Sequence, residues 1–454
     1  MRNGGVLPRI TAGAVSCLIL QLCAPQAIAE DLAYEASLGA GHSDNILRNP
    51  GNEKSENIAS AGLQFSFDKQ SSKLQADAVG DLAYFDYRDN TFDSQFVGNF
   101  AGNALFAFVP ERFQWVVSDN FGQVLSDPFQ PATPDNDENL NYFTTGPDVT
   151  FAFGSQTRLR VGGRYSLTSY QESPLDSDSI AGQLALIHLL SSSSSISLNG
   201  RVEQVKFKEE SLNGDYDQDD AYIRYEAQGA RTRLGLDAGY SRIDRDAATN
   251  SDGGLLFRLD VSRRISGSSV VLLTGGREFT SSGSAFASTQ TAVGVSLNAA
   301  PGRQTVQPFT RDYVTLAWNF SRNRTGLALL GSWNDQSYQD NPGLDQTITR
   351  FGAELRRDLS QTTSLSFNAN RSSTSFEQPG VDYDEDIAGA EFSWRLSRNV
   401  VLGLSYNYFH RNSDLATADY TENRYWLRIG YARGTPRTGY LLPTFAIDSA
   451  TTGT

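Results

Sequence analysis

The chain has 454 residues, of which 39% are hydrophobic and 20% charged, and its formal net charge is −14. Mean hydropathy is −0.39, and only the N-terminal segment approaches the roughly 20 consecutive apolar residues of a membrane-spanning helix, so the composition excludes a helical membrane protein. Glycine, tyrosine and phenylalanine are abundant and the single methionine is the initiator, a composition that favours strands and tight turns over long helices.

The first predicted element is a targeting segment at residues 1–29. Arg2 and Arg9 precede an apolar run that ends in an Ala-Ile-Ala sequence, which is typical of a secretory signal peptide cleaved between Ala29 and Glu30. A membrane anchor is the alternative, but a glutamine and a proline interrupt a run that is already short for a span. Both cysteines lie in this segment, so we expect the exported chain to have no thiol, disulfide or cysteine metal site.

Apolar and polar residues then alternate in blocks of roughly ten along residues 32–434. This period is typical of tilted strands that cross an apolar band of ~25 Å with lipid outside and water inside. In the block at 159–167, apolar side chains alternate with Arg158, Arg160 and Arg164. Three cations on one face of a strand do not pack in a dry core. The pattern predicts an all-β protein, a closed antiparallel transmembrane β-barrel.

Short turns alternate with long acidic loops, which places the turns in the periplasm and the loops outside the cell. We expect about 20 strands (18–22), an even number that leaves both chain ends in the periplasm. The expected domains are a signal peptide (1–29), the barrel (30–434) and a C-terminal tail (435–454). The predicted strands are 32–42, 56–68, 73–87, 93–108, 113–125, 139–153, 157–170, 178–190, 194–208, 218–229, 231–243, 254–265, 269–279, 309–321, 325–338, 346–359, 363–377, 385–397, 399–411 and 422–433.

The segment Thr280–Pro308 has no clear strand pattern. It is predicted either to be a loop folded over or into the barrel, or to hold a further strand pair around Ala292–Leu297. A soluble double sheet or solenoid is the alternative to a barrel as a whole. Aromatic residues near block ends favour the barrel, because they suit the interfacial girdles of a membrane protein. These residues are Tyr84, Tyr87, Tyr142, Tyr170, Trp333, Tyr338 and Tyr425.

Two stretches contain short loop motifs. One is Gly41–Ile46, and the other runs from Ser118 to Pro147 and includes Asp-Pro-Phe at 127–129 and Pro-Asp-Asn at 134–136. With these motifs the chain resembles the outer-membrane β-barrel proteins, described as β-barrel porins, that are encoded with exopolysaccharide biosynthesis and PEP-CTERM (exosortase) systems. The resemblance implies a location in the outer membrane of a Gram-negative bacterium and a role in making or exporting a surface polysaccharide. It implies no agreed set of functional residues.

The end of the chain departs from the usual barrel pattern. Outer-membrane barrels commonly finish on a terminal aromatic residue, whereas here the last predicted strand ends near Tyr431 and the tail 435–454 follows. Either the insertion machinery reads Tyr431 internally, or the tail folds back into the periplasmic mouth.

No catalytic or cofactor motif is present. The three histidines are far apart in sequence, and there is no zinc-protease or nucleophile-elbow motif, so we expect neither an enzyme nor a cofactor or metal site. A Ser/His/Asp set assembled from distant strands stays open as an alternative. The acidic loop around Asp215–Asp220 lacks the glycine and the closing glutamate of a calcium loop. Divalent ions that bridge acidic loops to lipopolysaccharide are a hypothesis.

Charged residues at the inward positions are the candidate functional residues. Arginine binds carboxylate and sulfate through two parallel hydrogen bonds, so an arginine-lined wall would suit an acidic polysaccharide. Alternatively, cross-strand pairs with carboxylates only stiffen a wet wall. The candidates are Arg158, Arg160, Arg164, Arg224, Arg258, Arg264, Arg350, Arg356, Arg395, Arg424 and Arg428, with Glu226, Asp237, Asp260, Glu354 and Glu391 as neighbours.

We therefore expect a monomeric, non-enzymatic outer-membrane barrel that assists export or assembly of a surface polysaccharide. The expected partners are membrane lipid, lipopolysaccharide, the polysaccharide itself and a periplasmic export component, while the acidic balance argues against nucleic acid. The alternatives are a general diffusion porin, a hydrolase or lyase carried on a barrel, and a structural or adhesin barrel plugged by Thr280–Pro308.

Overall fold

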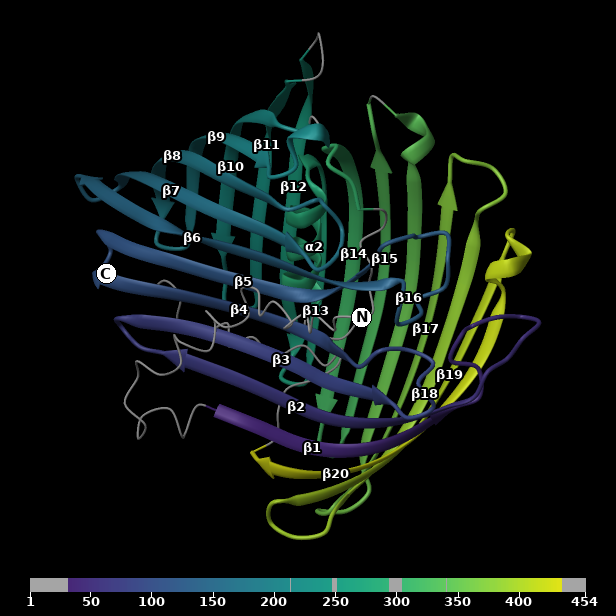
Figure 1. Cartoon of the computed structure of the whole chain (residues 1–454). Helices are drawn as coiled ribbons and strands as arrows, with labels where there is room; N and C mark the ends of the chain where they lie inside the picture. Colours follow the sequence, from purple (N-terminus) through teal and green to yellow (C-terminus); the bar gives the residue numbers. More distant parts are fainter. Residues whose placement is uncertain (1–31, 213, 247–250, 294–303, 340, 435–454) are drawn as a thin grey trace, which may run out of the picture.

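The computed structural model describes residues 32–212, 214–246, 251–293, 304–339 and 341–434, with the side chains of 289–293 left aside. Twenty strands form one antiparallel sheet, and the first strand pairs with the last, so the sheet closes into a barrel (Figure 1). This confirms the predicted fold class. The predicted signal peptide, its cleavage site at Ala29 and Glu30, and the C-terminal tail lie outside the described residues.

The strands are β1 Leu32–Ser43, β2 Glu56–Gln70, β3 Leu74–Tyr87, β4 Gln95–Val109, β5 Phe113–Leu125, β6 Asp137–Phe153, β7 Thr157–Tyr170, β8 Ser177–Ser191, β9 Ser194–Phe207, β10 Tyr216–Gln228, β11 Thr232–Arg245, β12 Asp252–Ser266, β13 Ser269–Thr280, β14 Phe309–Arg322, β15 Thr325–Ser337, β16 Gln346–Asp358, β17 Thr363–Phe376, β18 Tyr383–Arg395, β19 Val400–Ser413 and β20 Tyr420–Arg433. The helical segments among these described residues are α2 Ser282–Val293 and three short 3₁₀ turns, η2 Glu210–Leu212, η3 Pro342–Leu344 and η4 Ala416–Ala418.

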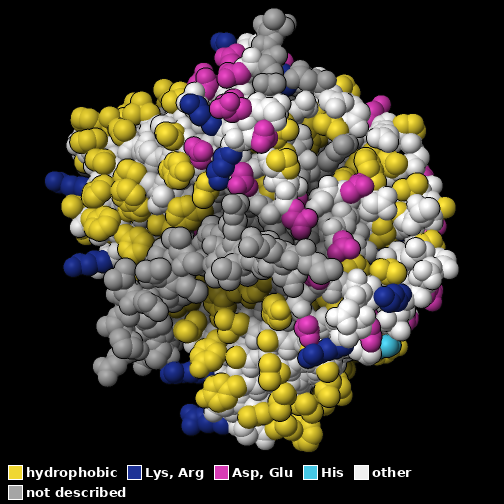
Figure 2. Space-filling view, in the orientation of Figure 1, with side chains coloured by type: hydrophobic (Ala, Val, Ile, Leu, Met, Phe, Trp, Pro, Cys, Tyr) yellow, Lys and Arg dark blue, Asp and Glu magenta, His cyan; other side chains and the backbone are white. Residues whose placement is uncertain are grey.

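Strand periodicity separates an apolar outer face from a polar inner face. On β8, Ile180, Leu184 and Leu186 are strongly exposed, and their register partners on β7 are apolar and exposed or half-buried as well. Because side chains alternate across a strand, the intervening arginines of β7 point inward. Figure 2 shows hydrophobic side chains gathered over the walls of the barrel and acidic ones near the loops at the top. An apolar exterior around a polar interior is the reverse of a soluble sheet protein.

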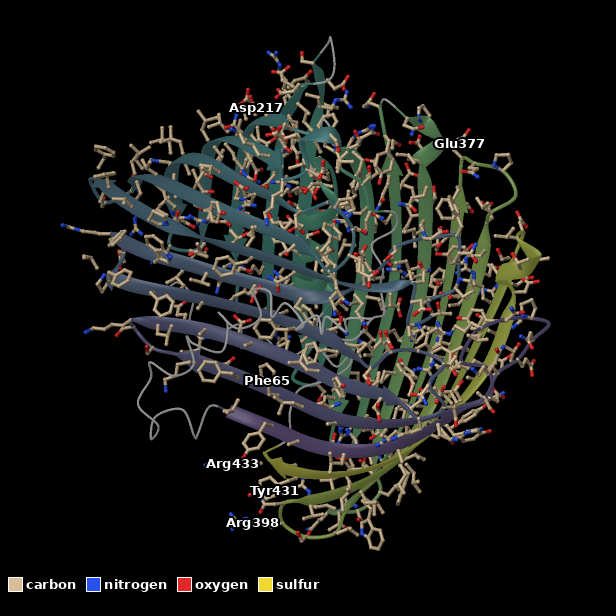
Figure 3. The ribbon with its side chains drawn as sticks, in the orientation of Figure 1. Phe65, Asp217, Glu377, Arg398, Tyr431 and Arg433 are labelled. Carbon is tan, nitrogen blue, oxygen red and sulfur yellow. The ribbon has the colours of Figure 1, made fainter. Side chains whose placement is uncertain are left out.

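The two ends of the barrel differ in their connections. Short turns join β2 to β3, β4 to β5 and each later even-numbered strand, up to β18, to the odd-numbered strand that follows it. We call this end of the barrel the turn end. The longer connections lie at the opposite loop end, where Asp217 and Glu377 project, while Arg433 lies at the turn end (Figure 3). Tyr431 is exposed on the outer face of β20 near the turn end, the position that an internally read insertion signal would occupy.

Some acidic residues that were predicted to lie in loops belong to the strands, which are up to two residues longer at the loop end than predicted. Asp217 and Asp219 belong to β10, where they lie opposite Asp244 and Arg242 of β11, because pairing continues beyond the apolar band. The prediction that Asp217 is a loop residue was therefore wrong, whereas Asp219 lies within the predicted strand 218–229. The same extension adds Asp137 to β6.

The described parts of the connection between β13 and β14, residues 281–293 and 304–308, lie inside the barrel. They contain helix α2, whose Phe286 is 1% exposed and packs among Val124, Leu140 and Tyr170 on the inner faces of β5, β6 and β7 (Figure 1). Ala292, which the alternative prediction placed in a strand pair, lies in this helix; Leu297 lies outside the described residues. Within the described part of the chain, no helix is long and apolar enough to cross a membrane.

The predicted girdle residues divide between the two faces. Tyr84, Trp333 and Tyr425 are exposed on the outer face, as expected of a girdle. The remaining four tyrosines point inward, and this part of the prediction was wrong because the loop end of the barrel is packed with inward-folded chain that their rings contact. These four are Tyr87, Tyr142, Tyr170 and Tyr338.

Candidate functional site

The structure places every charged candidate on the inner wall, in two groups. The first group lines a cavity, and the second lies on β7 and β10–β12, on the opposite side of the ring of strands. The first group consists of Arg350, Arg356, Arg395, Arg424, Arg428, Glu354 and Glu391. The second consists of Arg158, Arg160, Arg164, Arg224, Arg258, Arg264, Glu226, Asp237 and Asp260.

We call the inner wall of β16–β20 and β1–β3 the open half. It borders a cavity of about 1000 Å³ whose lining is rich in serine, asparagine and glycine besides the charged residues. Three aromatic side chains on inner-face positions, Phe85, Phe409 and Trp426, also line it. A lining of this kind offers many hydrogen-bonding groups and a few apolar rings to a hydrophilic solute.

Arg428 joins two carboxylates of the open half. Its guanidinium lies 3.3 Å from Glu35 and 2.7 Å from Glu391, so it bridges β1 and β18. Nearby, the side-chain amide of Gln64 donates to Asp81 at 3.1 Å. Gln64, Asp81, Arg428 and Glu391 are partly exposed and can exchange hydrogen bonds with a solute, whereas Glu35 is buried.

Other arginines of the open half are more exposed. Arg356 lies 3.4 Å from Asp358 on its own strand, with both side chains nearly half exposed, and Arg395 is exposed near the turn end. Exposed pairs of this kind contribute little to stability, because water screens them. Their charge is therefore available to ions and anionic solutes in the cavity.

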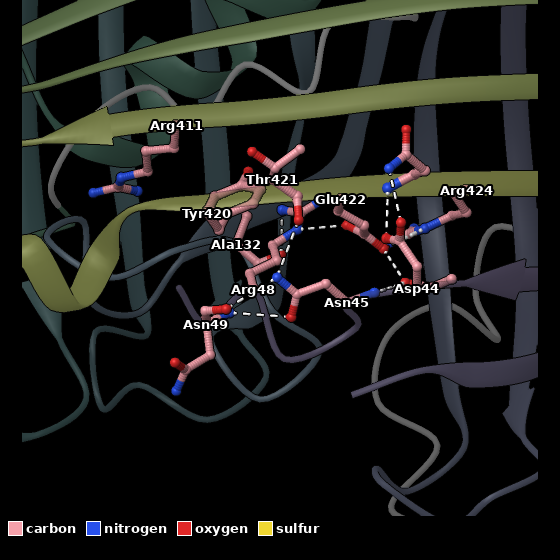
Figure 4. A network of polar contacts seen from close by, with 12 residues as sticks. Asp44, Asn45, Arg48, Asn49, Ala132, Arg411, Tyr420, Thr421, Glu422 and Arg424 are labelled. Carbon is pink, nitrogen blue, oxygen red and sulfur yellow. Dashed lines mark hydrogen bonds and ion pairs between the residues drawn. The ribbon is translucent and has the colours of Figure 1, made fainter. Parts of the chain in front are cut away.

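A buried carboxylate holds the rim of the open half at the loop end. Glu422 accepts hydrogen bonds from Ser43 at 2.6 Å, from Arg48 at 2.9 Å and from Arg424 at 2.6 and 2.9 Å (Figure 4). Burial alone would lower the pKa of the Arg48 guanidinium, but Tyr420 and Glu422 oppose this effect, so the pKa is raised and the side chain stays charged.

The same rim joins the two stretches that carry the family resemblance. Arg411 donates to two backbone carbonyls of the loop between β5 and β6, at 2.8 and 2.9 Å, and Arg48 donates to the carbonyl of Ala132 at 2.6 Å. The loop that contains Asp127–Phe129 thus reaches across to the loop that follows Gly41–Ile46. Backbone carbonyls buried in this way need such donors, so these arginines hold the loop in place.

The opposite wall, on β5–β14, is called the filled half. Here Arg224 binds Asp237 through two hydrogen bonds of 2.6 and 2.9 Å, and Arg258 contacts Asp237 at 3.5 Å and Glu278 at 2.5 Å. Asp237 is 1% exposed, so its charge depends on the two arginines. These residues form a cross-strand network that stiffens the wall.

Further arginines of the filled half are paired unequally. Arg164 makes two hydrogen bonds with Asp148, of 3.0 and 2.8 Å, whereas Arg158 reaches Glu111 only at 3.7 Å and Arg160 is exposed. The pairing is tightest where the wall is buried and loosens toward the turn end.

Polar contacts tie the inward-folded segment to the filled half. Arg311 of β14 donates to Ser288 of α2 at 2.7 Å, and the hydroxyl of Tyr170 donates to Gln304 at 2.9 Å. Ala285 packs in a buried cluster that also contains Tyr338. These contacts, together with Phe286, fix the described parts of the segment against both sides of this half.

No histidine is among the described residues that line the cavity. His42, His188 and His410 all lie at outer-face positions of β1, β8 and β19. Among the described residues no group of three or more His, Cys, Asp or Glu is arranged to hold a metal ion. The polar groups that line the cavity offer hydrogen-bonding and ion-pairing chemistry.

Sequence analysis missed several inner-face residues. Glu35, Asp81, Phe85 and Trp426 line the cavity but were not among the candidates. Strand alternation predicts that Trp426 faces inward, because it lies two residues from both Arg424 and Arg428 and therefore shares their face of the strand. Its ring carries no charge, so the pattern of charged residues does not identify it.

No family model matches the chain, and no curated protein matches it. Among solved structures, the siderophore receptor PirA from Acinetobacter baumannii is similar at 9% identity, with 89% of this chain and 80% of that chain covered and a TM-score of 0.45. PirA from Pseudomonas aeruginosa is similar at 13% identity, with 88% and 80% covered and a TM-score of 0.40. OccK2 (OpdF) from Pseudomonas aeruginosa, crystallised with glucuronate, is similar at 12% identity, with 88% and 96% covered and a TM-score of 0.37.

Proposed function

We propose that this protein is a monomeric outer-membrane β-barrel that provides a polar path for a surface polysaccharide during its export or assembly. One chain closes the barrel by pairing β1 with β20, so no second copy is needed to complete the wall. The apolar outer face suits lipid, and the predicted signal peptide supports export from the cytoplasm.

The observation that carries the proposal is the cavity of the open half. The cavity has a volume of about 1000 Å³ and is bordered by arginines, carboxylates, amides and hydroxyls on adjacent strands. Such a wall replaces part of the hydration shell of a hydroxyl-rich polymer and discriminates against apolar solutes. The polysaccharide as cargo is supported by the resemblance to barrels encoded in exopolysaccharide operons.

In this proposal the turn end faces the periplasm, where an export component delivers the polymer. The loop end faces the outside, where acidic and basic residues of the outer face, such as Arg242 and Asp244, meet lipopolysaccharide. That outer-face pair lies 2.9 Å apart and is exposed, so it is accessible to lipid head groups and to divalent ions.

The test is a deletion strain complemented by the intact gene, with polysaccharide quantified separately at the cell surface and in the periplasm. Loss at the surface with accumulation in the periplasm is the expected result. Normal surface polysaccharide would contradict the proposal. A complementing variant with Arg395, Arg356 and Arg428 changed to glutamine tests whether the cavity wall is the path.

A general diffusion porin is the second candidate. The observation in its favour is the mixed charge of the cavity wall, in which Arg428 lies between two carboxylates, so that the wall is polar without a single dominant sign. A porin would give steady conductance to small ions in planar bilayers and no change in surface polysaccharide on deletion.

A further inference from the structure

The indole of Trp426 lies flat against the inner wall. Its register partner on β1 is Gly41, and a Cβ atom at that glycine would stand 2.6, 2.7 and 2.8 Å from three indole carbons. Three nearly equal distances mean that the ring presents a face, not an edge, to the backbone of β1. A Cβ would point into the barrel at this position, so only glycine leaves room for the ring to pack flat against the backbone of β1.

A second glycine on the same face of β1 leaves further room for the indole. Gly39, two residues along β1, would place a Cβ 3.7 Å from the indole and 2.5 Å from the hydroxyl of Ser60. Two glycines on the same face of one strand therefore let a tryptophan side chain cross from β20 over β1. Glycine in the interior of a strand weakens it, so a packing reason is expected where it occurs, and the indole supplies that reason.

Phe85 continues the aromatic surface from β3. Its ring centroid lies 5.4 Å from that of Trp426 with an interplanar angle of 30°, an offset stack. A buried cluster of Ile46, Ile58 and Tyr87 packs against both rings and anchors their loop-end side. Both rings are partly exposed and line the cavity, so the ring surface that neither β1 nor the stack covers is open to it.

Hydrogen-bonding groups border this surface toward the turn end. Directly beyond the rings come small inner-face residues of the cavity lining, including Ser37 and Gly62. Next along the same strands lie the pair of Gln64 with Asp81 and the contact of Arg428 with Glu35. An apolar ring face beside planar hydrogen-bonding side chains matches a sugar ring, which has an apolar C–H face and hydroxyls at its edge.

We propose that the inner wall of β20, β1, β2 and β3 is a binding subsite for a pyranose ring, with Trp426 and Phe85 as the stacking platform. The proposal rests on the proposed function, since it names the carbohydrate contact within the same path. The sugar packs its C–H face on the rings, and its hydroxyls bind the carboxylates, the amide and the guanidinium beside them.

The distribution of tryptophans allows a specific measurement. The chain has five, and the other four, Trp115, Trp318, Trp333 and Trp394, lie at outer-face positions. Lipids with brominated chains quench fluorescence of side chains that face the membrane and leave the inward ring emitting. In such vesicles the emission of the intact protein reports mainly on Trp426.

The experiment titrates the reconstituted protein with maltohexaose, cellohexaose and hexagalacturonate. We expect at least one of them to change the residual emission saturably, and to block ion current in planar bilayers over the same concentration range. Trp426→Ala should raise the half-blocking concentration about tenfold, since one stacking contact is worth roughly 1.4 kcal/mol at that ratio. Trp426→Phe should recover part of the affinity, and Trp394→Phe on the outer face should leave it unchanged.

Two further variants keep the test independent of misfolding. Phe85→Leu preserves an apolar side chain, and Gly41→Ala displaces the indole without removing it; each barrel is first checked for heat-modifiable gel mobility. Weakened block in both, with normal mobility, supports the platform. Equal block by all variants, or no saturable emission change with any of the three sugars, overturns it.

If the protein conducts ions and its deletion removes surface polysaccharide while no sugar binds, only the subsite fails. If it neither conducts nor affects the polymer, the proposed function fails, while the fluorescence titration still decides the subsite.

Discussion

The open and filled halves of the barrel arise from the same alternating sequence pattern but present different surfaces. In the filled half, helix α2 lies in the interior and the buried Asp237 joins two arginines. In the open half, the wall borders a cavity, and Arg356 and Arg395 are exposed. The difference shows that inward charges are structural where they pair in buried positions, and that they are available to solutes where they lie exposed along the cavity.

The largest effect should come from removing the inward-folded segment. Deleting residues 283–305 takes away α2 and opens the filled half, because a barrel of 20 strands is wide enough for an aqueous channel unless it is filled. Single-channel conductance in planar bilayers should rise several-fold. Deletion of the exposed residues 378–380 in the loop after β17 is the control and should leave conductance unchanged. An unaltered current in the first variant would mean that the segment does not limit conduction.

A second prediction contrasts two carboxylates. Asp237→Asn leaves two arginines of the filled half without their shared charge and should lower the free energy of unfolding by about 3 kcal/mol. Asp358→Asn changes an exposed pair of the open half and should cost less than about 1 kcal/mol. Urea titrations of both variants in lipid vesicles measure the difference. Equal losses would show that the two halves do not differ in the burial of their ion pairs.

The smallest effect concerns ion selectivity. Arg395→Gln removes an exposed cation from the cavity, so the cation-to-anion permeability ratio should rise by about 1.5- to 2-fold. Arg264→Gln, near the turn end of the filled half, should change the ratio less. Reversal potentials across a salt gradient measure both variants, and a larger shift for Arg264→Gln than for Arg395→Gln would contradict this expectation.

Local sequence was sufficient to predict the strands and their faces. Alternation around Arg158 and Arg164 identified the inward face, and the predicted strands agree with β1–β20 within two residues at their ends. This works because the side-chain period of a strand is two and does not depend on distant contacts. The same reasoning failed for Tyr142 and Tyr170, whose rings contact α2 or its flanking chain and do not form a girdle.

By itself, the sequence determined the fold class, the number of strands and the face of the sheet on which each side chain lies. These properties follow from backbone geometry and a repeating pattern of polarity. Only the tertiary structure decided which inner residues line a cavity, because that depends on where the segment after β13 lies. It also decided that Trp426 rests on Gly41, two residues that are 385 positions apart and meet only because β1 and β20 close the barrel. Contacts across a closed sheet have no local signal, so this part of the site became visible only in the folded molecule.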